Sequence, residues 1–165
     1  MPKWLRAVLG GLAVLLVVAG AGYYWFIVES NMPSDAGYTF DIGEVRRMVA
    51  AVPGDKPERV EVEKIAAFSF PATAIVAGDG WTQRDMPVCS YRLVYPRRTV
   101  VIDTALSADL GGDNLVSFDP DAYARMTEAM AGASLIVITH EHMDHIGGIV
   151  EHPDLAAILP NTRLT

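Results

Sequence analysis

The sequence predicts an α/β domain of packed helix and sheet layers, preceded by an apolar segment of membrane-spanning length. Three observations predict this class. An uncharged run occupies residues 7–28, strand-like patterning dominates residues 59–105, and a helix followed by a buried strand occupies residues 119–139. No internal repeat competes with this reading.

The first segment carries no charge from Ala7 to Val28. A helix of this length spans about 30 Å, which matches the hydrocarbon core of a bilayer. Lys3 and Arg6 precede the run and acidic residues follow it, so the positive-inside rule predicts a cytoplasmic N-terminus and a periplasmic or extracellular domain. Residues 1–29 are therefore predicted to be a single-pass membrane anchor.

A cleaved signal peptide is the alternative for the same segment. Residues 19–21, Ala-Gly-Ala, resemble a cleavage site, and removal of residues 1–21 would give a secreted protein. The apolar run continues through aromatic residues 23–26, which favours an anchor that stays in the bilayer. Both alternatives export the rest of the chain.

The charge of the chain argues against a nucleic-acid partner. The formal net charge is −7, and Lys3 and Arg6 lie before the apolar run, so the exported part is more acidic than the whole. No basic stripe interrupts it. We therefore expect no nucleic-acid binding.

The predicted linker comprises residues 30–39, which combine Pro, Gly and small polar residues. The folded domain is predicted to comprise residues 40–165. It opens with a helix capped by Asp41, whose apolar residues fall on one helical face before Pro53 and Gly54 end it. These apolar residues are Ile42, Val45, Met48, Val49 and Val52.

Strand patterning follows from Arg59, where apolar and charged residues begin to alternate. Further strand candidates are residues 68–77, 88–95 and 99–102. Pro71 implies an edge or a break in the first of these.

A helix is predicted to begin at Asp119-Pro120 and to end at Gly132. The β-branched run at residues 134–139 follows it. Such a run is typical of a strand that is buried on both faces between helices.

Four possible metal ligands come directly after this strand: His140, His142, Asp144 and His145. Imidazole and carboxylate suit zinc, and also iron or manganese. The spacing can serve two ions about 3.5–4 Å apart, with His140 and His142 on one ion and the other two residues on the second. The glycines Gly147 and Gly148 would allow tight turning or close backbone approach.

This segment has two alternative interpretations. It could be a histidine-rich surface loop without a ligand. The helical His-Glu-x-x-His zinc motif fails, because Asp144 and not histidine stands at the required position after His140 and Glu141.

The run His-x-His-x-Asp-His followed by Gly-Gly, after a strand that ends in Thr, resembles the signature of metallo-β-lactamase-fold hydrolases. The resemblance implies a site with two zinc ions and a bridging hydroxide as nucleophile. His140 and His142 would bind the first ion, and Asp144 and His145 the second, with Asp144 also the candidate catalytic residue. Histidine at 142, where the di-iron flavoprotein branch has glutamate, favours a hydrolase.

The resemblance extends upstream to residues 100–104, which look like the strand of that family that ends in Ile-Asp-Thr-Gly. Asp103 would then lie beneath the metals and orient their ligands. Its alternative role is to cap the strand end. Ala105 stands where the family usually has glycine.

The resemblance covers about residues 60–165 and implies the first half of an αβ/βα metallo-β-lactamase sandwich, preceded by the transmembrane helix. The remaining ligands of the family, two histidines and a bridging aspartate, have no counterpart in residues 146–165. We therefore expect a fragment that lacks the C-terminal half of its domain, binds metal weakly and is inactive alone. One face of its sheet should be uncovered.

Two functions follow from the sequence. The first is a membrane-anchored, metal-dependent hydrolase that acts on a small-molecule ester, lactone, thioester or β-lactam. The second is a membrane-anchored, non-catalytic metal-binding or interaction module derived from the same fold.

Overall fold

The computed structural model of the protein describes residues 1–29 and 37–165. The predicted linker, residues 30–39, thus lies outside the described residues except for its last three. The chain forms two compact units. One contains the N-terminal helix together with residues 70–84, and the other contains residues 40–69 and 85–165.

The elements follow one another in this order: α1 (Lys3–Tyr23), a π-helical turn η1 (Tyr24–Val28), α2 (Ile42–Ala51), β1 (Arg59–Pro71), α3 (Ala72–Ile75), β2 (Gln83–Val94), β3 (Thr99–Ile102), α4 (Ala108–Gly111), a 3-10 turn η2 (Gly112–Asn114), β4 (Leu115–Phe118), α5 (Pro120–Ala131), β5 (Leu135–Ile138), α6 (Met143–Val150), α7 (Leu155–Ile158), a 3-10 turn η3 (Leu159–Asn161) and β6 (Thr162–Leu164).

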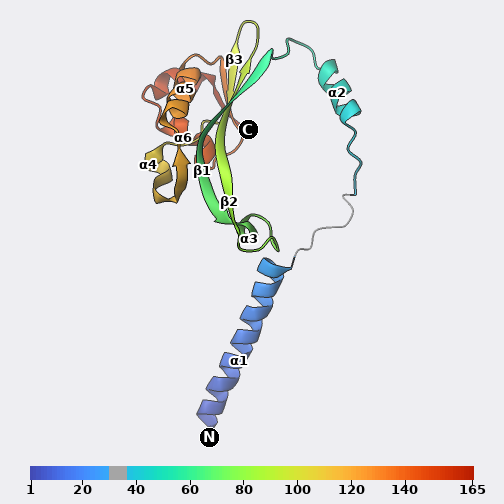
Figure 1. The fold of residues 1–165 in the computed structure, drawn as a ribbon, viewed down its shortest axis with the longest axis vertical. Helices are drawn as coiled ribbons and strands as arrows, with labels where there is room; N and C mark the ends of the chain where they lie inside the picture. The colour runs from blue at the N-terminus through green and yellow to red at the C-terminus, as the bar shows by residue number, and fades with distance from the viewer. Residues whose placement is uncertain (30–36) are drawn as a thin grey trace. The chain divides into compact units, whose positions relative to one another are not determined.

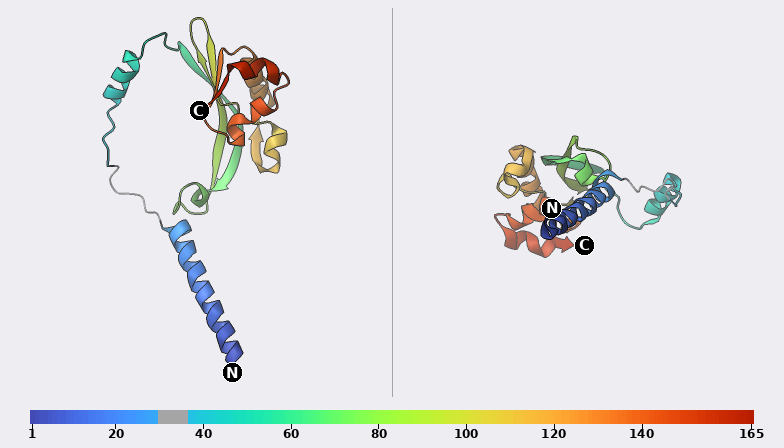
Figure 2. Two further views of the ribbon diagram at one scale, coloured as in Figure 1. Left: turned by 180° about the vertical axis from the view of Figure 1, so that it is seen from behind. Right: turned by 90° about the horizontal axis from the view of Figure 1, so that it is seen from below.

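The sheet has six strands in the order β4-β1-β2-β3-β5-β6. β1 pairs with β4 and β2 with β3 in antiparallel fashion, whereas β3, β5 and β6 run parallel. Helices α4, α5 and α6 all lie on the same face of the sheet (Figure 1 and Figure 2). The predicted mixed α/β class is confirmed.

The hydrophobic core lies between this face and the helices. Its largest fully buried apolar side chains come from strands and helices alike: Ile65, Val101, Leu106, Met126, Met130, Ile136, Ile138 and Ile158. Along β5, Ile136 and Ile138 are buried, but the side chains that alternate with them, Leu135 and Val137, are partly exposed. The prediction that this strand is buried on both faces is therefore wrong, because the helices of the described chain cover one face only.

The two predicted helix starts are confirmed. Asp119 caps α5 by accepting hydrogen bonds from Asp121 N and Ala122 N, with Pro120 at the first position. Asp41 caps α2 by accepting from Gly43 N and Glu44 N. The apolar side chains of α2 at positions 42, 45, 48, 49 and 52 are nevertheless exposed.

The structure corrects the strand candidate at residues 68–77. β1 continues unbroken from the preceding segment but ends at Pro71, after which α3 forms a short helical turn. Pro71 has no N–H to give to a strand ladder, and its fixed φ suits the position before a helical turn. The short elements α3, α4, β4, α6 and β6 were not predicted.

The N-terminal helix has no buried residue. The stretch Lys3–Val28 is, within the described residues, the one helix that is long and apolar enough to cross a membrane. A signal sequence has the same length and composition. The fold thus agrees with either reading of this segment.

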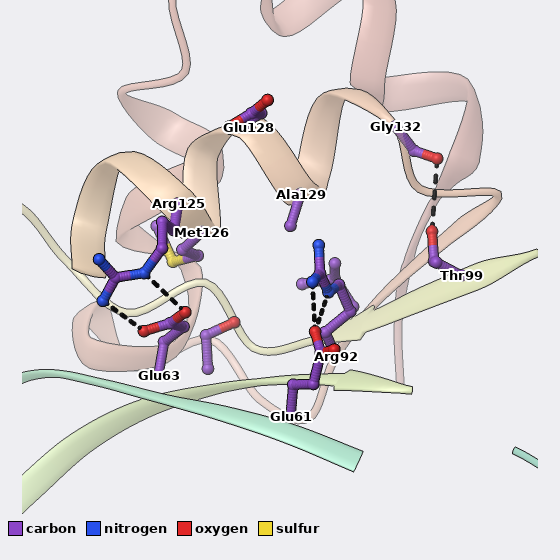
Figure 3. A pocket seen from close by; sticks show the side chains of 11 residues that line it. Glu61, Glu63, Arg92, Thr99, Arg125, Met126, Glu128, Ala129 and Gly132 are labelled. Carbon is purple, nitrogen blue, oxygen red and sulfur yellow. Dashed lines mark hydrogen bonds and ion pairs between the residues drawn. The ribbon is translucent and has the colours of Figure 1, made fainter. Parts of the chain in front are cut away.

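A cavity of about 380 Å³ lies between α5 and the sheet (Figure 3). Of the residues that line it, Thr99 begins β3 and Gly132 is the C-cap of α5. Arg125 on α5 bonds to Glu63 on β1 through two hydrogen bonds of 2.9 Å, which keep the pKa of Glu63 below its usual value. The cavity is therefore closed on one side by an ion pair that ties α5 to the sheet.

We predict that Arg125→Met lowers the free energy of unfolding slightly at neutral pH, and that the difference disappears in acid. The pKa of Glu63 is lowered in the folded state, so the ion pair stabilises the fold above the usual value of 4.5 and is lost as the pH falls through the folded pKa. The effect is small because exposed pairs are screened by water. Urea unfolding of the full chain in detergent, at neutral pH and in acid, measures it.

Arg97→Met is the matched control, because Arg97 faces Asp55 at 3.6 Å and its side chain is 87% exposed. It should change the stability at neither pH. An equal loss at both pH values in Arg125→Met would show that packing of its aliphatic stem, rather than its charge, stabilises α5.

Candidate metal centre

The histidine-rich segment lies where β5 ends and α6 begins. His140 comes shortly after the strand, and His142 is the residue that precedes the first turn of α6. Asp144 and His145 lie in that first turn. The segment therefore occupies the carboxyl edge of parallel strands, where open α/β sheets commonly bind ligands.

The four predicted ligands lie close together in pairs. The ring centroid of His140 is 4.6 Å from that of His142 and 3.9 Å from that of His145. The Nε2 atom of His145 lies 3.5 Å from Oδ2 of Asp144. All four side chains are at least partly accessible to solvent, and His142 is the most open of the histidines.

Asp103 is buried beneath this cluster, with 5% of the residue exposed. Its Oδ2 atom lies 2.8 Å from Nδ1 of His145. Its Oδ1 atom accepts hydrogen bonds from the backbone N–H of Thr139 at 2.8 Å and from the Thr139 hydroxyl at 3.0 Å. Asp103 thus accepts hydrogen bonds at the end of β5 and also contacts His145, one of the candidate ligands.

The backbone around Asp103 adopts an uncommon conformation. Asp103 and Ala105 have φ angles of 57° and 50°, in the left-handed region that costs a residue other than glycine about 1–2 kcal/mol. Thr104 between them donates from its backbone N to His145 O at 2.7 Å and from its hydroxyl to the same oxygen at 3.0 Å. The turn after β3 is therefore held directly against the first turn of α6. A glycine would adopt the conformation of Ala105 without strain.

The two glycines of the motif lie where α6 touches this turn. A Cβ atom on Gly148 would stand 2.2 Å from Thr104 O, and one on Gly147 would stand 2.9 Å from Ala105 O. Gly148 N also donates to Ala105 O at 3.1 Å. The close approach predicted for these glycines is confirmed, and it sets the position of the cluster relative to β3.

The donor chemistry of the cluster suits a divalent metal, since three imidazoles and one carboxylate are available. The hydrogen bond from His145 to Asp103 also matches the carboxylate that commonly orients a ligating histidine. In the part of the chain that the structure describes, however, no three His, Cys, Asp or Glu side chains converge on one point that could hold an ion. The residues fit a metal in their donor chemistry, but within the described residues they form pairs instead of a closed set.

The fourth histidine of the chain, His152, has a different environment. It is buried after α6, and its Nδ1 atom accepts a hydrogen bond from Asp154 N at 3.1 Å. Its Nε2 atom has no hydrogen-bond partner within the described residues. No signal in the sequence indicated that this ring would be buried.

Fold and cluster together define a mixed α/β protein with a candidate metal centre at the carboxyl edge of its sheet. No protein-family model matches the chain, and no curated protein sequence matches it.

Solved structures with partial likeness come from lactone hydrolases. A quorum-quenching N-acyl homoserine lactone lactonase superposes with a TM-score of 0.48 and 14% identity, over 68% of this chain and 59% of that chain. An N-acyl homoserine lactone hydrolase with the product N-hexanoyl-L-homoserine at its catalytic metal centre gives 0.46 and 12%, over 67% and 60%. A mutant B. thuringiensis protein with N-decanoyl-L-homoserine at its active site gives 0.47 and 12%, over 67% and 60%. The chain thus spans less than two thirds of the length of these proteins.

We predict that Gly148→Ala destabilises the protein by about 1–3 kcal/mol, the usual range for overpacking a filled site. The added methyl group would overlap Thr104 O, a backbone atom that cannot rotate away. The matched control is Gly132→Ala, because nothing lies within 4 Å of a Cβ atom at that position. Urea unfolding of the full chain in detergent measures both, and equal stability of the two variants would refute the close approach.

Proposed function

We propose that the chain contributes the cluster His140, His142, Asp144 and His145 to the metal centre of a metallo-β-lactamase-fold hydrolase. The observation that carries this proposal is the hydrogen bond between the buried Asp103 and His145, beneath a group of imidazoles. A surface loop that is merely rich in histidine needs no buried carboxylate to orient one of its rings.

Each residue of the cluster has a distinct part in this proposal. His140 and His142 would hold one ion, while Asp144 and His145 would hold the second. Zinc is the expected metal, and iron or manganese would also suit these donors. Asp103 binds Nδ1 of His145 and thereby leaves Nε2, the atom that lies 3.5 Å from Asp144, available as a ligand.

A divalent ion in this position would supply Lewis acidity for hydrolysis of an ester-type bond. The chain itself supplies accessible donors at a sheet edge and a buried carboxylate that holds one of them. We propose a small-molecule ester, lactone, thioester or β-lactam as the substrate. The neighbouring structures include lactone hydrolases, and the acidic net charge of −7 disfavours a nucleic-acid substrate.

The N-terminal helix completes the proposal as a membrane anchor. Lys3–Val28 would cross the membrane once, with the N-terminus in the cytoplasm and the α/β domain in the periplasm or outside the cell. Cleavage of residues 1–21 as a signal peptide would instead release the same domain.

A second candidate function is supported by one observation. Because no three candidate ligands converge within the described residues, the chain could be a membrane-anchored metal-binding module without hydrolytic activity. The two functions share the metal and differ in catalysis.

We predict that the double variant His140→Ala/His142→Ala and the single variant Asp144→Ala bind less metal than the wild type, and that any hydrolysis of lactone and ester substrates by the wild type is lost in both. Elemental analysis of the full chain, purified in detergent without chelator, measures the metal. Glu141→Ala is the matched control, because Glu141 is an exposed carboxylate in the same segment that is not a predicted ligand. It should keep the metal content of the wild type.

Asp103→Asn tests the positioning role. It keeps the size of the side chain but weakens the charge-assisted bond to His145, and outer partners of this kind change metal affinity by about 10–100-fold. Metal bound equally by wild type and the His140/His142 double variant would contradict the metal centre. Metal lost in that variant, together with a wild type that hydrolyses none of these substrates, would favour the non-catalytic module.

A further inference from the structure

The end of the apolar helix is bonded to a distant part of the chain. The last carbonyls of a helix have no partner within the helix. The carbonyl of Ile27 accepts two hydrogen bonds, from the Thr73 hydroxyl at 2.8 Å and from Gly78 N at 3.0 Å. Thr73 and Gly78 belong to the connection between β1 and β2, in the same compact unit as the helix. This connection, residues 70–82, is called the hairpin tip below.

The hairpin tip satisfies much of its own backbone. Ala72 N donates to Thr82 O at 2.8 Å, and Thr73 N donates to Gly80 O at 2.7 Å. Val76 N donates to Ala72 O at 2.8 Å, which closes the turn α3. Internal hydrogen bonding of this kind removes the largest cost of moving a backbone out of water.

The surface of the hairpin tip is apolar. Trp81 is 62% exposed, and Ile75 and Val76 are 43% and 44% exposed. Asp79 is the one ionisable residue between positions 70 and 82, and its Oδ2 lies 3.7 Å from Nη2 of Arg84. An exposed tryptophan beside two aliphatic side chains is the composition that favours the interfacial layer of a bilayer.

The length of the helix determines the depth in the bilayer at which the helix would meet the hairpin tip. Lys3–Val28 has 26 residues, so the helix extends about 39 Å at 1.5 Å per residue, beyond a hydrocarbon core of about 30 Å. Its last turn, with exposed Tyr24, Trp25 and Phe26, would therefore reach the headgroup region. The hairpin tip is bonded to Ile27 and so lies at that same level.

We infer that the hairpin tip is a second membrane contact, which seats Ile75, Val76 and Trp81 in the interfacial layer of the bilayer beside the end of the helix. The inference rests on the proposed membrane anchor. Its partner is the lipid surface itself. The connection between β1 and β2 would thereby tie the α/β domain to the membrane at a point that is remote in sequence from the anchor.

Tryptophan fluorescence tests this contact in the full chain, reconstituted into phosphatidylcholine vesicles. The chain has three tryptophans, Trp4, Trp25 and Trp81. The variant Trp4→Phe/Trp25→Phe reports from position 81, and the variant Trp4→Phe/Trp81→Phe reports from position 25. Lipids brominated near the headgroup end of their acyl chains should quench both variants to a similar extent, and aqueous iodide should quench neither strongly.

The two reporters separate failure of the inference from failure of the anchor. Quenching by bromolipid at position 25 but not at 81 would leave the anchor standing and overturn the membrane contact of the hairpin tip. Quenching at neither position would overturn both. Protection of Trp81 from iodide without quenching by bromolipid would show that protein, such as a second copy of the chain, covers the tip, and would also overturn the inference.

A matched pair of variants tests the aliphatic side chains. In the background that reports from Trp81, Ile75→Asp/Val76→Asp should reduce quenching by bromolipid and increase quenching by iodide, because charge is costly in the interfacial layer. Val60→Asp/Val62→Asp is the control, since Val60 and Val62 are similarly exposed on β1 outside the hairpin tip. It should leave both quenching values unchanged, and an equal effect of the two pairs would contradict the contact.

Discussion

The candidate site depends on one buried carboxylate. Asp103 follows β3 directly, accepts hydrogen bonds from the backbone and the hydroxyl of Thr139 at the end of β5, and bonds to His145 in the first turn of α6. A carboxylate with 5% exposure is stable in the folded state only if such partners replace its hydration. This arrangement requires a strained, left-handed backbone at Asp103 and Ala105. It also requires a glycine at position 148, because α6 packs directly against Thr104 there.

Two aspartates of the site differ because of burial. The side chain of Asp103 is 6% exposed and fully engaged with protein donors, whereas that of Asp144 is 38% exposed and lies 3.5 Å from Nε2 of His145. The carboxylate of Asp103 therefore contacts the ring of His145, whereas the carboxylate of Asp144 is accessible to a metal ion. This division supports a metal centre in which Asp103 positions and Asp144 binds. Within the described residues these donors form pairs, and no three of them converge on one point.

Within each compact unit, a further set of contacts joins elements that are distant in sequence. Helices cover one face of the sheet, and the ion pair between Arg125 and Glu63 ties α5 to that face. In the other compact unit, the carbonyl of Ile27 is bonded to the connection between β1 and β2. These hydrogen bonds lie within one compact unit, and they are the basis of the membrane contact inferred for the hairpin tip.

The sequence alone determined the features that depend on neighbouring residues: the caps at Asp41 and Asp119, the strand Leu135–Ile138, the apolar helix and the clustered ligands. Capping and periodicity act within one or two turns, so they can be read from short stretches. Only the tertiary structure decided that β5 is buried on one face, that β4 and β6 are strands, that Asp103 bonds to His145, and that the hairpin tip bonds to the apolar helix. Each of these depends on which distant segments become neighbours, and a short apolar run has the same pattern whether one face or both are covered.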